Sequence, residues 1–185
     1  MKQPYVAGML GAQLAERLRR AILAAPVITM SNKVPKGHPT HVAAPDAELE
    51  LLNAQNIYHG NDGLLEMLYG EVLEDLYAPV ANAFQSPWKA LRARSWQTKP
   101  GANMGPAKRH MDGQGKHLLK IMVYSTETEN GGGGFEINIM DRIETLCGPA
   151  GMWILFHNSE YGHRGIPPDS GKPNRVATEF TVKAC

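Results

Sequence analysis

The triplet His110-Met111-Asp112 is the part of the sequence best suited to chemistry. Residues i and i+2 of an extended chain point to the same face, with Cα atoms about 6.5 Å apart. An imidazole and a carboxylate at this spacing can converge on one metal ion. The chain has no HExxH, GxSxG or CxxC motif and no serine or cysteine nucleophile motif, so the triplet is the starting point for a candidate site.

His163 supplies a third candidate ligand. It lies in the turn GHRG, just beyond the apolar run GMWILFH, where a side chain can reach a site from the end of a strand. Two imidazoles and one carboxylate, with three coordination positions left open, form the ligand set of a non-haem Fe(II) centre. The sequence therefore predicts a metal site made by His110, Asp112 and His163, with His157 of the apolar run as an alternative to His163.

Arg175 is a candidate anion-binding residue, twelve positions after His163 at the start of the last apolar run. A guanidinium group can hold a planar carboxylate by two parallel hydrogen bonds, and an apolar strand has no other use for an inward-facing cation. We therefore expect Arg175 to hold a carboxylate close to the metal site.

The second half of the chain predicts the strands that must position these groups. After Pro87, short runs with β character alternate with glycine and proline, which indicates an antiparallel sandwich or barrel. The four glycines Gly131–Gly134 are not followed by GK[ST], so they predict a tight strand connection rather than a phosphate loop. The expected strands are KALRARSWQT, HLLKIMVYST, GGFEINI, GMWILFH and RVATEFTVK.

The first half predicts supporting helices. Apolar residues recur at helical spacing before Pro26 and again before Pro79, and these prolines are expected to end the two helices. We expect a single domain over residues 1–185, in which residues 1–87 are mostly helical and residues 88–185 form the catalytic β core. The expected elements of the first half are helices over 8–25, 46–55 and 62–79, and a lid-like loop over 31–45.

Composition excludes several classes of protein. The 185 residues carry 19 Lys and Arg against 18 Asp and Glu, and this net charge of +1 argues against nucleic-acid binding. The two cysteines are far apart, which excludes a disulfide scaffold, and no apolar run has the roughly 18 residues of a membrane span. We therefore expect a cytoplasmic protein without a membrane or nucleic-acid partner.

Taken in order, these motifs resemble the Fe(II)- and 2-oxoglutarate-dependent dioxygenase superfamily. The resemblance covers about residues 90–183: the strand RARSWQTKPGA, HMD, the run LLKIMVYST, the glycines with FEI, the HRG turn and the arginine strand. Within the superfamily, the segment GPAGMWILFHNSEYGHRGIPPDSGKPNRVATEF looks most like the phytanoyl-CoA dioxygenase-like branch. The resemblance implies a mainly β α+β fold, the double-stranded β-helix (jelly roll) of cupin-like proteins.

The resemblance also implies roles for individual residues. His110, Asp112 and His163 would ligate Fe(II), and Arg175 would bind the C5 carboxylate of 2-oxoglutarate. Tyr124 matches a position at which many relatives direct a hydroxyl group at the same carboxylate. Relatives in this branch often carry another hydroxyl two residues after the arginine, but here that residue is Ala177, so Tyr124 or Thr178 would have to replace it.

The activity implied is oxidative decarboxylation of 2-oxoglutarate by O2, coupled to oxidation of a substrate. Since relatives that halogenate have a small residue in place of Asp112, hydroxylation is favoured. The alternatives are a cupin-like metalloenzyme that does not use 2-oxoglutarate and a non-catalytic jelly-roll binding module. Residues 31–45 and 101–109 carry no readable substrate code, although a small-molecule substrate is expected. The short chain favours an open site or one completed by a second subunit, as in a homodimer.

Overall fold

The computed structural model describes residues 3–25, 54–57, 62–102, 107–113 and 115–185. Two antiparallel sheets dominate these residues. The larger sheet has six strands in the order β1-β7-β4-β9-β3-β2, and the smaller has three in the order β6-β5-β8. The bounds of the strands are β1 Tyr5–Met9, β2 Ala54–Ile57, β3 Trp88–Thr98, β4 Leu118–Tyr124, β5 Phe135–Ile139, β6 Arg142–Leu146, β7 Met152–Phe156, β8 His163–Gly165 and β9 Arg175–Ala184.

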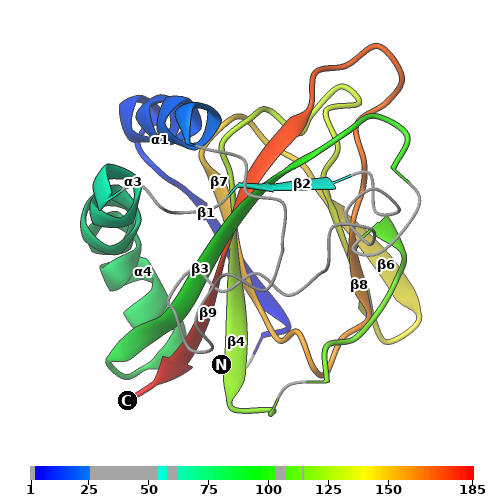
Figure 1. The fold of residues 1–185 in the computed structure, drawn as a ribbon. Coiled ribbons are helices and arrows are strands. Elements are labelled where there is room, and N and C mark those ends of the chain that lie inside the picture. The colour runs from blue at the N-terminus through cyan, green and yellow to red at the C-terminus, as the bar shows by residue number, and fades with distance from the viewer. Residues whose placement is uncertain (1–2, 26–53, 58–61, 103–106, 114) are drawn as a thin grey trace.

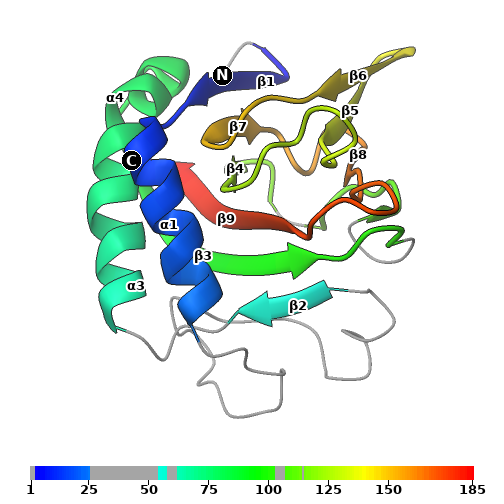
Figure 2. The same ribbon diagram turned by 90° about the horizontal axis from the view of Figure 1, so that it is seen from above.

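The helices cover one face of the six-stranded sheet. They are α1 Ala12–Ala24, α3 Asp62–Met67 and α4 Leu73–Phe84, with the π-helical turn η1 Leu68–Val72 between the last two. Both ribbon views place these helices on one side of the large sheet and the small sheet on the other (Figures 1 and 2). The sheets and helices confirm the jelly-roll architecture with N-terminal helices that the resemblance implied.

The two faces of the large sheet bury different cores. Between sheet and helices, the fully buried Leu18, Ile22 and Leu76 pack with Phe180 and Val182 of β9. Each such side chain contributes about 1.5–3 kcal/mol through its burial. Between the two sheets lies a smaller cluster, and it is this inner face that lines the candidate site described below. The buried members of the smaller cluster are Trp96, Met122, Tyr124, Phe135, Ile137, Met152, Ile154, Phe156 and Ala177.

A change of register marks β3. Its pairing with β9 shifts between Ala90 and Arg92, so that Leu91 has no partner in the ladder. Leu91 is also one of the exposed large apolar residues. One extra residue on one strand of an antiparallel pair is a β-bulge, which bends the strand and reverses the alternation of its side chains.

All five strands expected in the second half are present, whereas four other strands were not expected. β8 has only three residues and β6 is half exposed, so neither has a strong apolar pattern. β1 occupies residues that we assigned in part to a helix over 8–25, and the helix begins only at Ala12. A Cβ on Gly8 would overlap the Trp153 ring of β7, so this residue belongs to a close strand pairing that helical periodicity does not reveal.

The second expected helix does not end at Pro79. It begins at Asp62 as expected but continues through α4 to Phe84, with Pro79 inside it. Burial of Leu76 and Val80 on either side of the proline anchors the helix to the sheet, which offsets the backbone hydrogen bond that proline cannot make. Gln85 then ends it in the left-handed conformation, with φ of 58°.

The remaining expectations for the first half concern residues 31–55. The loop over 31–45 and residues 46–53 of the expected helix lie outside the described residues, and Ala54-Gln55 belong to β2 rather than to a helix. Since β1 and β2 pair with β7 and β3, the large sheet extends beyond the 88–185 range. No described helix has the length and apolar character to cross a membrane.

The glycine run forms a strand connection, as the sequence predicts. Gly131 and Gly133 have φ of 82° and 89°, which side chains rarely adopt. A Cβ on Gly133 would also come within 2.6 Å of the Ile166 carbonyl oxygen. The run therefore needs glycine for backbone reasons alone.

Candidate functional site

The structure brings His110, Asp112 and His163 together. One potential ligand atom from each residue lies within 4.8 Å of the others. His163 opens β8, and His110 pairs with it as an isolated antiparallel bridge that extends the small sheet by one residue. The backbone N–H of each histidine donates to the carbonyl oxygen of the other, at 3.0 and 2.9 Å.

Both imidazoles are oriented by backbone carbonyl groups. His110 Nδ1 lies 2.8 Å from the Lys108 carbonyl oxygen, and His163 Nδ1 lies 3.0 Å from that of Tyr161. Because a carbonyl oxygen only accepts, each Nδ1 carries the hydrogen and each Nε2 presents a lone pair. The two Nε2 atoms lie 3.8 and 3.9 Å from oxygens of Asp112, on the side where a metal would be held. Histidine ligands in metal sites are oriented by such outer hydrogen bonds.

Asp112 is held as a carboxylate. Its Oδ2 accepts from Lys120 Nζ at 2.6 Å and from Asn158 Nδ2 at 3.0 Å. Burial alone would raise the pKa of Asp112, but the Lys120 ammonium and the Asn158 amide outweigh it and lower the pKa. Burial also lowers the pKa of His163, which keeps its ring neutral. An ionised carboxylate and neutral imidazoles are the states that bind a metal ion.

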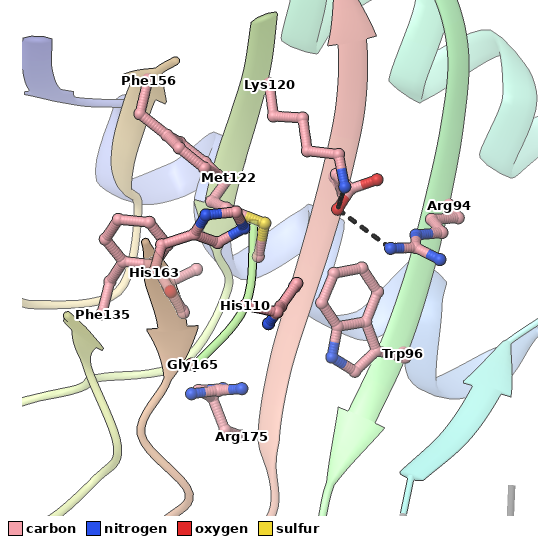
Figure 3. A pocket seen from close by; sticks show the side chains of 12 residues that line it. Arg94, Trp96, His110, Lys120, Met122, Phe135, Phe156, His163, Gly165 and Arg175 are labelled. Atoms are coloured by element: carbon pink, nitrogen blue, oxygen red, sulfur yellow. Dashed lines mark hydrogen bonds and ion pairs between the residues drawn. The ribbon is translucent and has the colours of Figure 1, made fainter. Parts of the chain in front are cut away.

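A cavity of about 400 Å³, partly open to solvent, lies between the sheets beside these ligands (Figure 3). Phe135 and Phe156 wall it on the His163 side, with ring centroids 5.9 and 4.8 Å from the imidazole. These aromatic walls exclude water from one side of the site. The lining residues are Arg94, Trp96, His110, Lys120, Met122, Tyr124, Phe135, Phe156, His163, Gly165, Arg175 and Glu179.

Arg175 is a buried cation without a counter-ion in the part of the chain that the structure describes. Its side chain donates to backbone carbonyl oxygens of Gly133, Gly134 and Ile166 and to Thr98 Oγ1, and no carboxylate pairs with it. Its Nε has no partner, and burial lowers its pKa, which the nearby Tyr124 only partly offsets. A buried charge is costly unless it is paired, so this position suits an anionic ligand.

Tyr124 lies beside this guanidinium. The centre of the Arg175 guanidinium is 5.5 Å from the Tyr124 ring centroid, and the fully buried hydroxyl group has no hydrogen-bond partner. Burial raises the pKa of Tyr124 to about 12, so the hydroxyl stays a neutral donor. A buried donor without a partner is rare in folded proteins and indicates a missing ligand.

Thr98 supplies the hydroxyl group that the sequence lacks at Ala177. Its Oγ1 lies 3.2 Å from an Arg175 nitrogen. Thr178, which we named as a possible replacement, instead shares a 2.7 Å hydrogen bond with Ser95 and belongs to the helix side of the sheet. Thr98 could have been found only from the β3–β9 register, in which it is the direct partner of Arg175.

A second group missed by the sequence analysis is a buried charge cluster. Glu179 Oε2 lies 2.9 Å from Lys120 Nζ and 3.0 Å from an Arg94 nitrogen. Burial alone would raise the pKa of Glu179, but the two cations lower it to about 2. Through Lys120, the cluster continues to Asp112. The signal in the sequence was Lys120 itself, a charge inside the apolar run LLKIMVY that needs a buried partner.

Some residues singled out by sequence lie elsewhere. His157 is not part of the triad, and its Nδ1 lies 3.8 Å from Glu160. His117 is exposed. Trp153 packs in the core between the sheet and the helices, whereas Trp96 lines the cavity.

The polar residues flanking the triad have other contacts. Lys108 offers its carbonyl oxygen to His110, and Arg109 pairs with Glu136 at 2.9 Å. Gln97 accepts a hydrogen bond from Asn174 outside the cavity. Asn103 lies outside the described residues.

Comparison with solved structures defines the fold class. The chain superimposes on HygX from Streptomyces hygroscopicus, solved with nickel and 2-oxoglutarate bound, with a TM-score of 0.64 and 12% identity over 98% of this chain and 83% of that one. A Pseudomonas putida prolyl-4-hydroxylase gives 0.61 and 13% over 98% and 94%. SnoN, a non-haem α-ketoglutarate-dependent epimerase from nogalamycin biosynthesis, gives 0.65 and 14% over 99% and 78%.

The chain therefore has the jelly-roll fold of Fe(II)/2-oxoglutarate-dependent oxygenases. No protein-family model and no curated protein sequence matches it. The phytanoyl-CoA dioxygenase-like branch stays a prediction.

Proposed function

We propose that this protein is an Fe(II)- and 2-oxoglutarate-dependent oxygenase that hydroxylates a small molecule. The observation that carries the proposal is the buried Arg175, which faces the same cavity as the triad and has no carboxylate partner among the described residues. A metal site alone would fit many enzymes. A metal site beside an unbalanced guanidinium fits a cosubstrate that chelates through one end and carries a carboxylate at the other.

In this proposal His110, Asp112 and His163 hold Fe(II), which with O2 and 2-oxoglutarate supplies the oxidising chemistry. Asp112 contributes one negative charge to the ion and fills the position that halogenating relatives leave open. Lys120 and Asn158 fix its orientation. The fit is chemical, because the donor set is two neutral imidazoles and one carboxylate with room for further ligands.

Arg175 and Tyr124 orient the cosubstrate. The guanidinium binds its C5 carboxylate, and the Tyr124 hydroxyl, which otherwise has no partner, donates to the same group. Gly165 leaves room for this arrangement, since a Cβ there would come within 2.7 Å of an Arg175 nitrogen. The apolar walls Phe135 and Phe156 keep bulk water from the site.

The remaining expectations extend this proposal. Residues 1–185 form one domain, in which β1 and β2 complete the catalytic sheet. The protein acts in the cytoplasm, without a nucleic-acid or membrane partner, in keeping with its net charge of +1. A second subunit that completes the open side of the site, as in a homodimer, stays part of the proposal.

Two other functions make different demands. A cupin-like metalloenzyme that does not use 2-oxoglutarate would have no need for the Arg175 pocket and would tend to use three histidines. A non-catalytic jelly-roll module would not need a metal ion held tightly by the triad.

The deciding experiment measures binding and turnover separately. Under nitrogen, we expect the protein to bind Fe(II) and then 2-oxoglutarate, with the visible charge-transfer band of the chelate. On admission of O2, it should release succinate. Metal binding without 2-oxoglutarate binding would favour the cupin-like function, and absence of metal binding would favour the binding module. His117→Ala, an exposed histidine outside the site, is the matched control for His163→Ala.

A further inference from the structure

Arg94 occupies a position that the cosubstrate does not reach. On the cavity side of β3 the residues alternate as Arg94, Trp96 and Thr98, and they pair with Glu179, Ala177 and Arg175 of β9. Arg94 and Arg175 therefore lie at opposite ends of the same row, separated by four residues of β9, or about 13 Å at 3.3 Å per residue. The Trp96 ring lies between them, 5.2 Å from the Arg94 guanidinium (Figure 3).

Charge balance distinguishes the cations of the cavity. Arg94, Lys120 and Arg175 line it, and the carboxylates around them are Glu179 and Asp112. When the proposed site is loaded, the two charges of Fe(II) are balanced by Asp112 and the C1 carboxylate of 2-oxoglutarate. Arg175 is balanced by the C5 carboxylate, and Lys120 by Glu179, which it contacts at 2.9 Å. One positive charge then remains in excess.

That excess charge is most available at Arg94. Its side chain is 24% exposed, whereas that of Lys120 is 3% exposed. Of its five N–H donors, one nitrogen contacts Glu179 at 3.0 Å, while the buried Nε has no partner. Glu179 is shared with Lys120, so it cannot balance both cations.

We propose that Arg94 binds a carboxylate of the primary substrate, and that the enzyme acts on small monocarboxylates. This inference rests on the proposed function, since the excess charge arises when metal and cosubstrate are bound. One surplus charge suits a monoanion, whereas a phosphate dianion would leave a negative charge unbalanced in the cavity. The planar carboxylate also matches the guanidinium fork, and the Trp96 face offers an apolar surface for the carbon skeleton of the substrate.

The test measures binding to the loaded protein. Under nitrogen, the protein with Fe(II) and 2-oxoglutarate is titrated calorimetrically with a panel of free amino acids and aliphatic and aromatic monocarboxylates, and with the primary amide of each. We expect at least one carboxylate to bind while its amide does not. Arg94→Met should weaken that binding about 10- to 100-fold and leave 2-oxoglutarate affinity within twofold. Arg94→Lys, which keeps the charge, should recover part of the loss.

Arg92→Met is the matched control. Arg92 lies on the same strand and donates to Thr181, but it does not line the cavity, so its loss should not change carboxylate binding. The inference is overturned if amides bind as well as carboxylates, if no carboxylate of the panel binds at millimolar concentration, or if Arg94→Met leaves carboxylate binding unchanged. Wild-type protein that fails to bind Fe(II) or 2-oxoglutarate would instead refute the proposed function.

Discussion

His110 and His163 exchange two backbone hydrogen bonds, and their rings lie with centroids 4.5 Å apart. The bridge sets the distance between two proposed ligands through the backbone, so their placement does not depend on the metal. Their Nδ1 atoms are also held by carbonyl groups. A site prepared in this way loses little conformational entropy when a metal binds.

Asp112→Ala should abolish tight metal binding. The variant removes the only carboxylate of the triad and leaves two neutral imidazoles beside the Lys120 ammonium. We expect affinity for Mn(II) or Co(II), measured by calorimetry, to fall by more than about 100-fold. His117→Ala should bind like the wild type. Equal affinity of Asp112→Ala and the wild type would show that Asp112 is not a ligand.

Arg175→Ala should weaken 2-oxoglutarate binding. Loss of a charged hydrogen bond costs about 1.5–3 kcal/mol, which corresponds to roughly a 10- to 150-fold higher Kd. The measurement is anaerobic titration of the metal-loaded protein with 2-oxoglutarate, and metal affinity should not change. Arg175→Lys serves as a second variant, because truncation also leaves carbonyl groups of Gly133 and Gly134 without their donor. Unchanged cosubstrate affinity in both variants would contradict the assignment.

Gly165→Ala should have a similar effect without removing any charge. The new Cβ would lie 2.7 Å from an Arg175 nitrogen and displace the guanidinium. We expect a Kd for 2-oxoglutarate about tenfold higher, with the metal affinity of the wild type. Gly113→Ala, where a Cβ meets nothing within 4 Å, is the matched control. A variant that binds 2-oxoglutarate normally would mean that the guanidinium need not occupy its present position.

Glu179 should make stability depend on pH in acid. Its pKa is lowered to about 2, so its stabilising contribution is complete above the ordinary carboxyl range and disappears as the pH falls from about 4.5 towards 2. Glu179→Gln should lower the free energy of unfolding by about 3 kcal/mol at pH 6 in urea titrations. The difference between variant and wild type should shrink towards pH 2. Parallel stability curves would contradict this, and Glu16→Gln, at an exposed carboxylate, is the control.

The sequence predicted the long strands and the triad because their signals are local. His110 and Asp112 are two residues apart, and the apolar runs of β4, β7 and β9 stand out between glycines and prolines. The short strand β8 and the half-exposed β6 carry no such signal. Their positions are set by pairing with β5.

The remaining site residues depend on pairing between distant strands. Thr98 contacts Arg175, and Arg94 contacts Glu179, only because β3 lies beside β9 in one particular register. No local pattern reveals that register. Helix ends also depended on packing, since burial around Pro79 keeps α4 intact beyond the proline.

The bulge at Leu91 decides which residues of β3 can take part in chemistry. Before it, the even-numbered Trp88 and Ala90 pack towards the helices; after it, the even-numbered Arg94 and Trp96 point into the cavity. Deletion of this single exposed leucine would exchange the two sets, turning a guanidinium into the hydrophobic core and opening the cavity to Ala93 and Ser95. The spacing between the last helix and the first inward-facing arginine is therefore a requirement of the fold, and insertions or deletions there should be tolerated only in pairs.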